Sequence, residues 1–436
     1  MITTLKELTM SEWDRKGPDD CEELRGRFLD GSRSVHSVVT SLKEARLIEL
    51  TELRTGLEVK TFSHVGRIRV GEWIITVLPK LRGASLLKLL RYAYGFRRLA
   101  LISNTSHLIE PCGFEDLLVS QLNAEAQELL SRGLQRTYVA QHERLASPRG
   151  RIDIQKMAMD GGSVTATLPC RHFPRIENTL LNRVLLAGLQ LAGTVASSIS
   201  LRRESRRLGS LIEEQVSVIL LNGSVLEQVE RRMSRLTQSY ASAISIIRLL
   251  VEAQGIALEG KAATKRLPGF LFDMNAFFQM LLSRFLRENL PGFTVLDEKA
   301  LKGMMAYHPL HNPRQRRSPT PRPDYVISKQ SSVRAILDAK YRDLWERSLP
   351  RGILYQLVLY AISQHHKSES TILYPTTDMR AREAKINVTD PIRCSHIGRV
   401  CLRPVFLERL ETLVSDATSG GRVKRQQEAT RMAFGK

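Results

Sequence analysis

Two aspartates and one lysine in the carboxy-terminal half of the chain have the types and the spacing of a metal-dependent hydrolytic site. Asp324 opens an apolar, β-branched run of strand length, and Asp338 and Lys340 lie two residues apart near the end of the next such run. Alternate residues of a strand point to the same face of a sheet, so Asp338 and Lys340 share a face. A strand built only for a core would carry apolar side chains there. The pattern therefore indicates a metal site.

The chemistry that such a site supports is hydrolysis of a phosphodiester bond. Carboxylate oxygens from Asp324 and Asp338, with a backbone carbonyl and water, suit a hard octahedral cation such as Mg²⁺, with Mn²⁺ as the alternative. The cation would lower the pKa of a bound water and stabilise charge on the phosphoryl oxygens. The amine of Lys340 would orient that water, assist its deprotonation or help to neutralise the phosphate.

A hairpin and a helix must position these side chains. The runs 322–327 and 333–341, joined by a short polar break, predict two paired strands. An apolar run with helical spacing follows over 352–363, and its Gln356 and Tyr360 lie one turn apart on one face. Asp-x-Lys alone is common at a salt-bridged strand end, whereas Pro-Asp, Asp-x-Lys and Gln-x-x-x-Tyr in this order are much rarer.

The combination resembles the motif of the PD-(D/E)xK nuclease superfamily, and Gln-x-x-x-Tyr resembles the helix that follows the catalytic strands in its RecB-like branch. The resemblance implies a nuclease core in which helices flank a mixed sheet. The elements expected from the residue pattern fit that order. They are a helix over 273–288, a strand over 293–296, the hairpin, its helix, and strands over 371–374 and 399–404.

A segment rich in arginine and proline, 313–322, lies between the first strand of this core and the hairpin. Because it adjoins the expected site, its arginines would meet DNA phosphates as the scissile bond approaches. These arginines are Arg314, Arg316, Arg317 and Arg322.

The composition agrees with a nucleic-acid substrate. The chain has 436 residues and a formal net charge of +20. Such an excess predicts attraction to a polyanion, and double-stranded DNA fits the chemistry above. A ribosome-associated or merely basic protein would carry the charge but would not explain the carboxylates. Hydrophobic residues make up 42%, which is ordinary for a folded globular protein.

Neither a membrane nor an oxidising compartment is expected. The charge-free run 184–201 is long enough to span a bilayer, but polar residues and glycines dilute it, so a buried helix is the better interpretation. Residues 1–20 carry acids and do not form a secretory signal. The five cysteines are scattered and lack Cys-x-x-Cys spacing, which disfavours zinc and disulfides and fits a reducing cytoplasm.

Changes in the residue pattern predict an α+β or α/β chain of several domains. Short apolar-alternating runs and one leucine-rich helix open the chain, helical spacing dominates its middle, and a basic, glycine-containing tail closes it. The expected parts are an amino-terminal mixed β/α domain over 1–112, a helical middle over 113–262, the nuclease domain over 263–415 and a disordered tail over 416–436.

One stretch imitates a phosphate-binding loop. Residues 255–261 match most of that pattern, but Ala262 stands where a Ser or Thr should hold Mg²⁺, and a helix precedes the stretch instead of a strand. We therefore expect this chain to bind no nucleotide.

Beyond the nuclease motif, residues 45–405 resemble the McrC-type subunit of modification-dependent, 5-methylcytosine-specific restriction systems. Only the nuclease motif is specific alone, and the other matching stretches matter for their order. Those stretches are 65–70 leading into 78–80, 149–153, Asn182 with Arg183, and 271–278.

The resemblance implies a two-component machine. A separate AAA+ GTPase ring, McrB-like, would recognise modified DNA, while the McrC-like subunit contacts the ring with its amino-terminal part and cuts. Asp324 and Asp338 would be the metal ligands, Lys340 the catalytic lysine and Gln356 a supporting polar residue beside Tyr360.

One departure from the family pattern keeps alternatives open. Relatives often carry Glu where this chain has Gln279, after the paired aromatics of the helix that begins the nuclease domain. If that position supports the metal, binding here would be weaker. One rival hypothesis is a non-catalytic adaptor that stimulates a motor, its nuclease centre degenerate through Gln279. The other rival, independent of this position, is a stand-alone nuclease that needs no partner.

Overall fold

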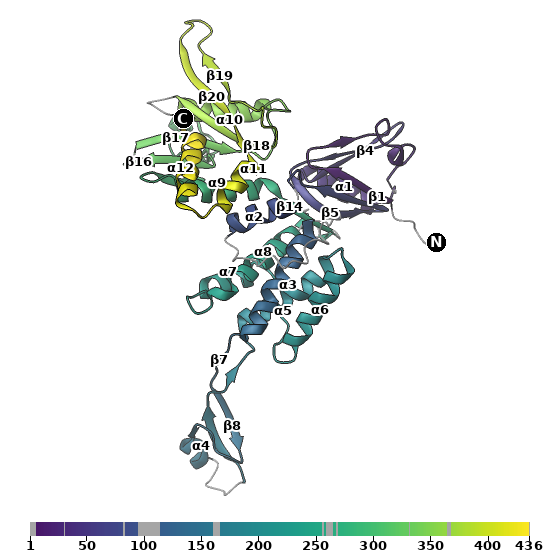
Figure 1. Cartoon of the computed structure of the whole chain (residues 1–436), viewed down its shortest axis with the longest axis vertical. Helices are drawn as coiled ribbons and strands as arrows, with labels where there is room; N and C mark the ends of the chain where they lie inside the picture. The colour runs from purple at the N-terminus through teal and green to yellow at the C-terminus, as the bar shows by residue number, and fades with distance from the viewer. Residues whose placement is uncertain are drawn as a thin grey trace. The chain divides into compact units, whose positions relative to one another are not determined.

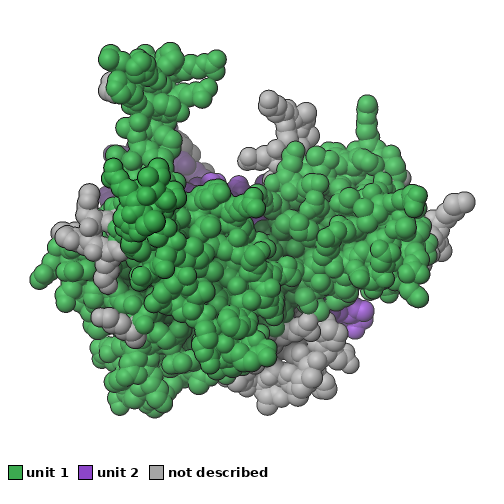
Figure 2. Space-filling view, turned by 90° about the horizontal axis from the view of Figure 1, so that it is seen from above, with its two compact units in different colours: residues 1–97, 256–436 green, residues 98–255 purple. Residues whose placement is uncertain are grey.

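The computed structural model divides the chain into two compact units (Figure 2). The first unit joins Met1–Arg97 with Ile256–Lys436, and the second is Arg98–Gly255. The parts expected as an amino-terminal domain and a nuclease domain thus belong to one unit. The structure describes residues 6–29, 31–81, 83–94, 114–159, 166–254, 257–258, 265–266, 269–330, 332–363 and 368–435.

The amino-terminal part of the first unit contains two sheets that share an apolar core. Alternating apolar residues such as Ile68, Ile75 and Val77 point into this core, as expected for strands with one buried face. One sheet has the order β1 (Lys6–Ser11), β6 (Trp73–Leu78), β5 (His64–Val70) and β14 (Gly269–Asp273), and the other has the order β2 (Arg15–Lys16), β4 (Gly56–Thr61) and β3 (Ile48–Leu53).

Strand β14 comes from much later in the chain than its neighbours in this sheet. It pairs antiparallel with β5, and its Leu271 joins the amino-terminal core. Its last residue, Asp273, also caps helix α9 (Met274–Asn289) by accepting a hydrogen bond of 2.8 Å from the backbone N–H of Asn275. The first helix of the expected nuclease domain therefore begins at the edge of the amino-terminal sheet.

The carboxy-terminal part is built on a sheet of six strands (Figure 1). Strand β17 pairs antiparallel with β16 and parallel with β18, so the sheet is mixed, and the predicted hairpin is present. The strand order is β15 (Thr294–Asp297), β16 (Tyr325–Lys329), β17 (Ser332–Ala339), β18 (Glu369–Thr376), β20 (His396–Phe406) and β19 (Ala384–Thr389).

Helix α10 (Arg351–Ile362) covers one face of this sheet. Its Leu357 and Tyr360 share a buried cluster with Ile336 of β17, Ile372 of β18 and Val400 of β20. Since alternate strand residues share a face, the side chain of Asp338 lies on the face that α10 covers.

The prediction of a disordered tail is wrong. Helix α12 (Ser419–Phe434) is capped at its start by Thr418, whose hydroxyl accepts a hydrogen bond from the N–H of Gly421. At its end it is capped by Gly435, which has a φ of 74°. The helix buries Ala429, Met432 and Ala433, which have helical spacing that the surrounding basic residues and glycines obscured.

The second unit is mainly helical, as expected, but it also contains short strands that the residue pattern did not predict. The apolar run 184–201 forms parts of two helices, because α5 ends at Val195 and α6 begins at Ile199. In the described part of the chain, no helix has both the length and the apolar character needed to cross a membrane. The helices are α3 (Phe114–Arg132), α4 (Ile154–Met159), α5 (Leu180–Val195), α6 (Ile199–Glu213), α7 (Gly223–Arg232) and α8 (Ala241–Gln254), and the strands are β7 (Thr137–Tyr138), β8 (Gln141–Leu145), β9 (Arg151–Ile152), β10 (Leu168–His172) and β11 (Arg175–Ile176).

Two expectations fall partly outside the described residues. Most of the phosphate-loop-like stretch 255–261 is among the residues that the structure leaves out, as is Cys112. The other four cysteines, Cys21, Cys170, Cys394 and Cys401, are free thiols.

Candidate active site

The three residues predicted to share a site lie together at one end of the hairpin. The Nζ atom of Lys340 is 3.0 Å from Oδ2 of Asp338 and 3.7 Å from Oδ2 of Asp324. Asp324 Oδ2 also accepts a hydrogen bond of 2.7 Å from the backbone N–H of Ala339. The register explains the arrangement: Tyr325 lies opposite Leu337, so the next residues outward, Asp324 and Asp338, face each other across the pair.

Asp338 is a buried carboxylate with too few partners. Its side chain is 1% exposed, and within the described residues neither of its oxygens receives a hydrogen bond, although Lys340 lies at ion-pair distance. Burial, and secondly the charge of Asp324, raise the pKa of Asp338 from its ordinary value of 3.8 to about 6. Removing a carboxylate from water with one ion-pair partner and no other donor costs free energy, so a purely structural role would be unfavourable.

The charge of Lys340 is stabilised by the two acids. Burial alone would lower the pKa of its amine, but the charges of Asp338 and Asp324 outweigh burial and raise the pKa above its ordinary value. The amine is therefore protonated at neutral pH and can only donate hydrogen bonds.

The donor set fits a hard divalent cation. Two carboxylates that converge, one of them with unsatisfied oxygens, provide the ligands that Mg²⁺ prefers. Across the described ranges there is no group of three or more His, Cys, Asp or Glu residues that could hold a metal. A cation here would therefore depend on Asp324 and Asp338, with water and backbone oxygen completing its shell.

We expect the thermal stability of the protein to reveal this site through pH. Because the folded pKa of Asp338 lies above its ordinary value, the folded state binds the extra proton between pH 3.8 and about 6, and stability falls as pH rises through that window. Mg²⁺ should compensate for the buried charge, raising the melting temperature clearly at pH 8 and little at pH 5. Equal Mg²⁺ shifts at both pH values would contradict a site at Asp338.

Helix α10 carries Gln356 and Tyr360, and Tyr360 lies near Asp324 and Asp338. Gln356 Nε2 donates a hydrogen bond of 2.7 Å to the hydroxyl of Tyr360, which is buried. Burial raises the pKa of Tyr360. The negative charges of the nearby Asp338 and Asp324 raise this pKa further, because they disfavour the phenolate. Gln356 thus fixes the tyrosine hydroxyl that faces the site.

Gln279 enters this region through its backbone. Its carbonyl oxygen accepts a hydrogen bond of 2.7 Å from the hydroxyl of Tyr325, the residue that follows Asp324. Helix α9 therefore supports the strand that carries Asp324, independently of the amide side chain of Gln279.

The arginines predicted to contact DNA are all exposed. Arg314 and Arg316 lie in a loop that Asn312 closes, because its side chain both accepts from the N–H of Arg316 and donates to its carbonyl, each at 2.9 Å, and Arg317 follows this loop. Arg322 is exposed two residues before Asp324.

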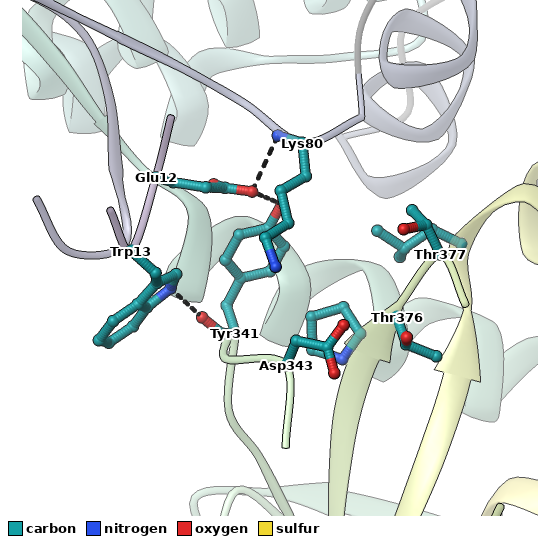
Figure 3. Close-up of a pocket in the computed structure, with 9 residues that line it drawn as sticks. Glu12, Trp13, Lys80, Tyr341, Asp343, Thr376 and Thr377 are labelled. Carbon is teal, nitrogen blue, oxygen red and sulfur yellow. Dashed lines mark hydrogen bonds between the residues drawn. The ribbon is translucent and has the colours of Figure 1, made fainter. Parts of the chain in front are cut away.

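The residue pattern did not reveal a second cluster next to the site. Tyr341 follows Lys340 and lines a pocket with residues that follow strands of the amino-terminal sheets, among them Glu12 and Trp13 after β1 and Lys80 after β6 (Figure 3). The only sequence signal was the continuation of the apolar strand into an aromatic residue just after the lysine.

A family model described as the McrBC 5-methylcytosine restriction system component matches residues 59–375, which is more than half of the chain. The chain belongs to this family. Outside this family match, no curated protein sequence matches the chain.

This chain shares its fold with a chain of one solved assembly. It resembles a chain in the refined half-complex from the tetradecameric assembly of Thermococcus gammatolerans McrB AAA+ hexamers with bound McrC, with a TM-score of 0.61 and 18% identity over 97% of this chain and 99% of that chain. A chain of the cryo-EM structure of the Thermococcus gammatolerans McrBC complex aligns with a TM-score of 0.45 and 17% identity over 65% of this chain and 88% of that chain.

Proposed function

We propose that this chain is the endonuclease subunit of a modification-dependent restriction system, and that it hydrolyses DNA phosphodiester bonds with Mg²⁺ when a separate AAA+ GTPase ring activates it. The observation that carries the proposal is the buried carboxylate of Asp338, which lies 3.0 Å from the ammonium of Lys340 and is close to Asp324. Membership in the McrBC family and the fold shared with a chain of the McrB–McrC assembly support the ring partner.

The residues of the site have distinct roles in this proposal. Asp324 and Asp338 hold the cation, which would activate water and stabilise charge on the phosphate. Lys340 is protonated beside them, so it donates to the attacking water or to the phosphate and does not act as the base. Gln356 keeps the Tyr360 hydroxyl in place at the wall of the site.

The central test is a reconstitution with the full chain. We expect double-stranded DNA containing 5-methylcytosine to be cut when the chain, its ring partner, GTP and Mg²⁺ are all present, and cutting to stop when EDTA replaces Mg²⁺. Cleavage by the chain alone, without nucleotide, would favour the stand-alone nuclease. Equal cleavage with wild type and with a variant that lacks Lys340 would favour the adaptor.

The exposed arginines should contribute to DNA binding by neutralising phosphates. Replacing Arg316 and Arg317 by alanine is expected to reduce the slope of log affinity against log salt by about 0.9 for every phosphate that the variant no longer neutralises. The control replaces Arg15 and Arg380, which are also exposed but are paired with acids, and removes the same charge. Fluorescence anisotropy with a labelled duplex gives both slopes, and equal slopes for the two double variants would contradict the assignment.

A further inference from the structure

Tyr341, the residue after Lys340, is bonded through all three of its polar groups, and Figure 3 shows the bonds to Trp13 and Glu12. Its N–H donates to Oδ1 of Asn275 at 3.1 Å, and its carbonyl accepts from Nε1 of Trp13 at 2.6 Å. Its hydroxyl donates to Oε1 of Glu12 at 2.8 Å. The ring is buried and packs edge-on against Phe278, with centroids 5.8 Å apart. The backbone next to the lysine is thus held at several points at once.

Each of these bonds leads to the amino-terminal sheets. Glu12 and Trp13 follow β1, and Oε1 of Glu12 also accepts from the backbone N–H of Lys80 at 2.9 Å. Asn275 is itself held by the amino-terminal part, because its Nδ2 donates to the hydroxyl of Ser63 at 2.6 Å. The position of Tyr341 is therefore set largely by residues 328 and 329 positions earlier in the chain.

The segment after Tyr341 is attached to the same region. The guanidinium of Arg342 lies 5.4 Å from the ring centroid of Trp13, and Arg347 donates to the carbonyl of Trp13. Lys80 and Glu346 form an ion pair of 3.3 Å at the surface. A displacement of the turn that carries Glu12 and Trp13 would therefore move this segment and the lysine next to it.

The burial of the acidic side chain of Glu12 costs free energy. Its side chain is 1% exposed, and among the described residues its Oε2 atom has no hydrogen-bond partner. Burial raises the pKa of Glu12 from 4.5 to about 7, against the effect of its bonds to Lys80 and Tyr341. The hydrogen bonds that Oε1 of Glu12 accepts from Tyr341 and Lys80 are the geometry that this buried acid provides.

We propose that Glu12 and Trp13 are positioning residues for the nuclease site: through Tyr341 they hold Lys340 in place beside Asp338 and Asp324, so that the amino-terminal sheets control whether the site is correctly assembled. The inference rests on the proposed function and adds the route by which the amino-terminal part reaches the chemistry. A shift of about 1 Å in a catalytic group is enough to lower a rate on the order of 100-fold, so small movements at this contact would regulate cleavage.

The test compares matched variants of the full chain with its ring partner, GTP, Mg²⁺ and 5-methylcytosine DNA. Tyr341→Phe removes only the hydroxyl, and Glu12→Ala removes its acceptor, whereas Glu12→Gln retains an acceptor oxygen. The control is Tyr92→Phe, which deletes another tyrosine–glutamate hydrogen bond of the same unit, the bond of 2.6 Å to Glu288.

We expect Tyr341→Phe and Glu12→Ala to lower kcat about 10- to 100-fold with KM for DNA unchanged, and the double variant to fall no further than either single one. Glu12→Gln and Tyr92→Phe should cut at nearly the wild-type rate. The ring's GTPase rate and the Mg²⁺ shift in melting temperature should stay at wild-type values in all four single variants.

The outcomes separate this inference from the proposed function. If wild type cuts, Lys340→Met does not, and Tyr341→Phe and Glu12→Ala cut like wild type, the positioning role is wrong and the nuclease assignment stands. If Glu12→Ala is too unstable to assay, Trp13→Phe provides the same test, because it keeps a ring but removes the donor to the Tyr341 carbonyl. If these variants all lose stability while kcat per folded molecule is unchanged, the contact stabilises the fold and does not position Lys340.

Discussion

Replacing Asp338 by asparagine is expected to abolish DNA cleavage, with a loss of at least about 10³-fold in rate, because a carboxylate that holds the catalytic cation contributes several kcal/mol to the transition state. The substitution keeps the shape of a side chain that is 1% exposed and removes only its charge. The measurement is single-turnover cleavage of 5-methylcytosine DNA with ring, GTP and Mg²⁺ in excess.

The stability of this variant distinguishes a catalytic aspartate from a structural one. At pH 8 the buried, poorly bonded charge of Asp338 costs the metal-free wild type roughly 3 kcal/mol, given a pKa raised from 3.8 to about 6. Asp338→Asn should therefore melt at the same or a higher temperature without metal, and should lose the Mg²⁺ shift. A lower melting temperature together with intact cleavage by the remaining folded fraction would show that Asp338 is structural.

Asp297→Asn is the matched control for this experiment. Asp297 lies on the same sheet, but Ser283 donates to its Oδ2 at 2.7 Å and Arg287 pairs with it at 2.6 Å. Its charge is already satisfied by protein groups, so it has no need of a cation. We expect Asp297→Asn to retain cleavage and the Mg²⁺ response, with a modest decrease in stability from the weakened ion pair.

Lys340→Met should also eliminate cleavage, by about 10²- to 10³-fold, because the ammonium that lies against both acids would no longer stabilise charge on the phosphate. Methionine keeps the length and the apolar stem of lysine, so packing changes little. In contrast with Asp338→Asn, this variant should still respond to Mg²⁺ at pH 8, since both carboxylates remain and only the competing cation has been removed.

Lys385→Met serves as the control for the lysine. Lys385 lies on β19 of the same sheet and pairs with Glu383 at 3.1 Å, where it is half exposed. Cleavage by Lys385→Met should equal that of wild type. Wild-type rates for Lys340→Met as well would remove Lys340 from the mechanism, and a lost Mg²⁺ shift would show that the lysine is needed to assemble the metal site.

Local pattern was sufficient to predict the elements that carry the site. The hairpin, α9 and α10 lie within a few residues of their predicted ranges, because each has a clear period of apolar residues and ends at recognisable turn or capping residues. Only part of the convergence of Asp324, Asp338 and Lys340 could be predicted. Alternation along a strand places Asp338 and Lys340 on one face, whereas Asp324 faces Asp338 only because the register of the hairpin shifts between Ile327 and Ser328.

What could not be predicted depends on contacts between distant parts of the chain. Nothing in the run 269–273 shows that it would pair with β5, because edge strands of different sheets look alike in sequence. The tail was predicted to be disordered because its charged residues look like a solvent-exposed segment. One of them, Glu428, is in fact buried and paired with Arg409 and Arg431. The bonds on Tyr341 were invisible for the same reason, since their donors and acceptors come from the other end of the chain.

The placement of β14 limits how this protein can be dissected or recombined. A fragment that starts at residue 269 would contain β14 without its partner strand β5. Phe270 and Phe272, which are both buried in the intact chain, would then become accessible to water. Chimaeras that exchange the two halves between relatives would have to transplant β5 and β14 as a matched set. An inactive hybrid with a break between them would therefore report a mismatched sheet, and would say nothing about which half chooses the DNA.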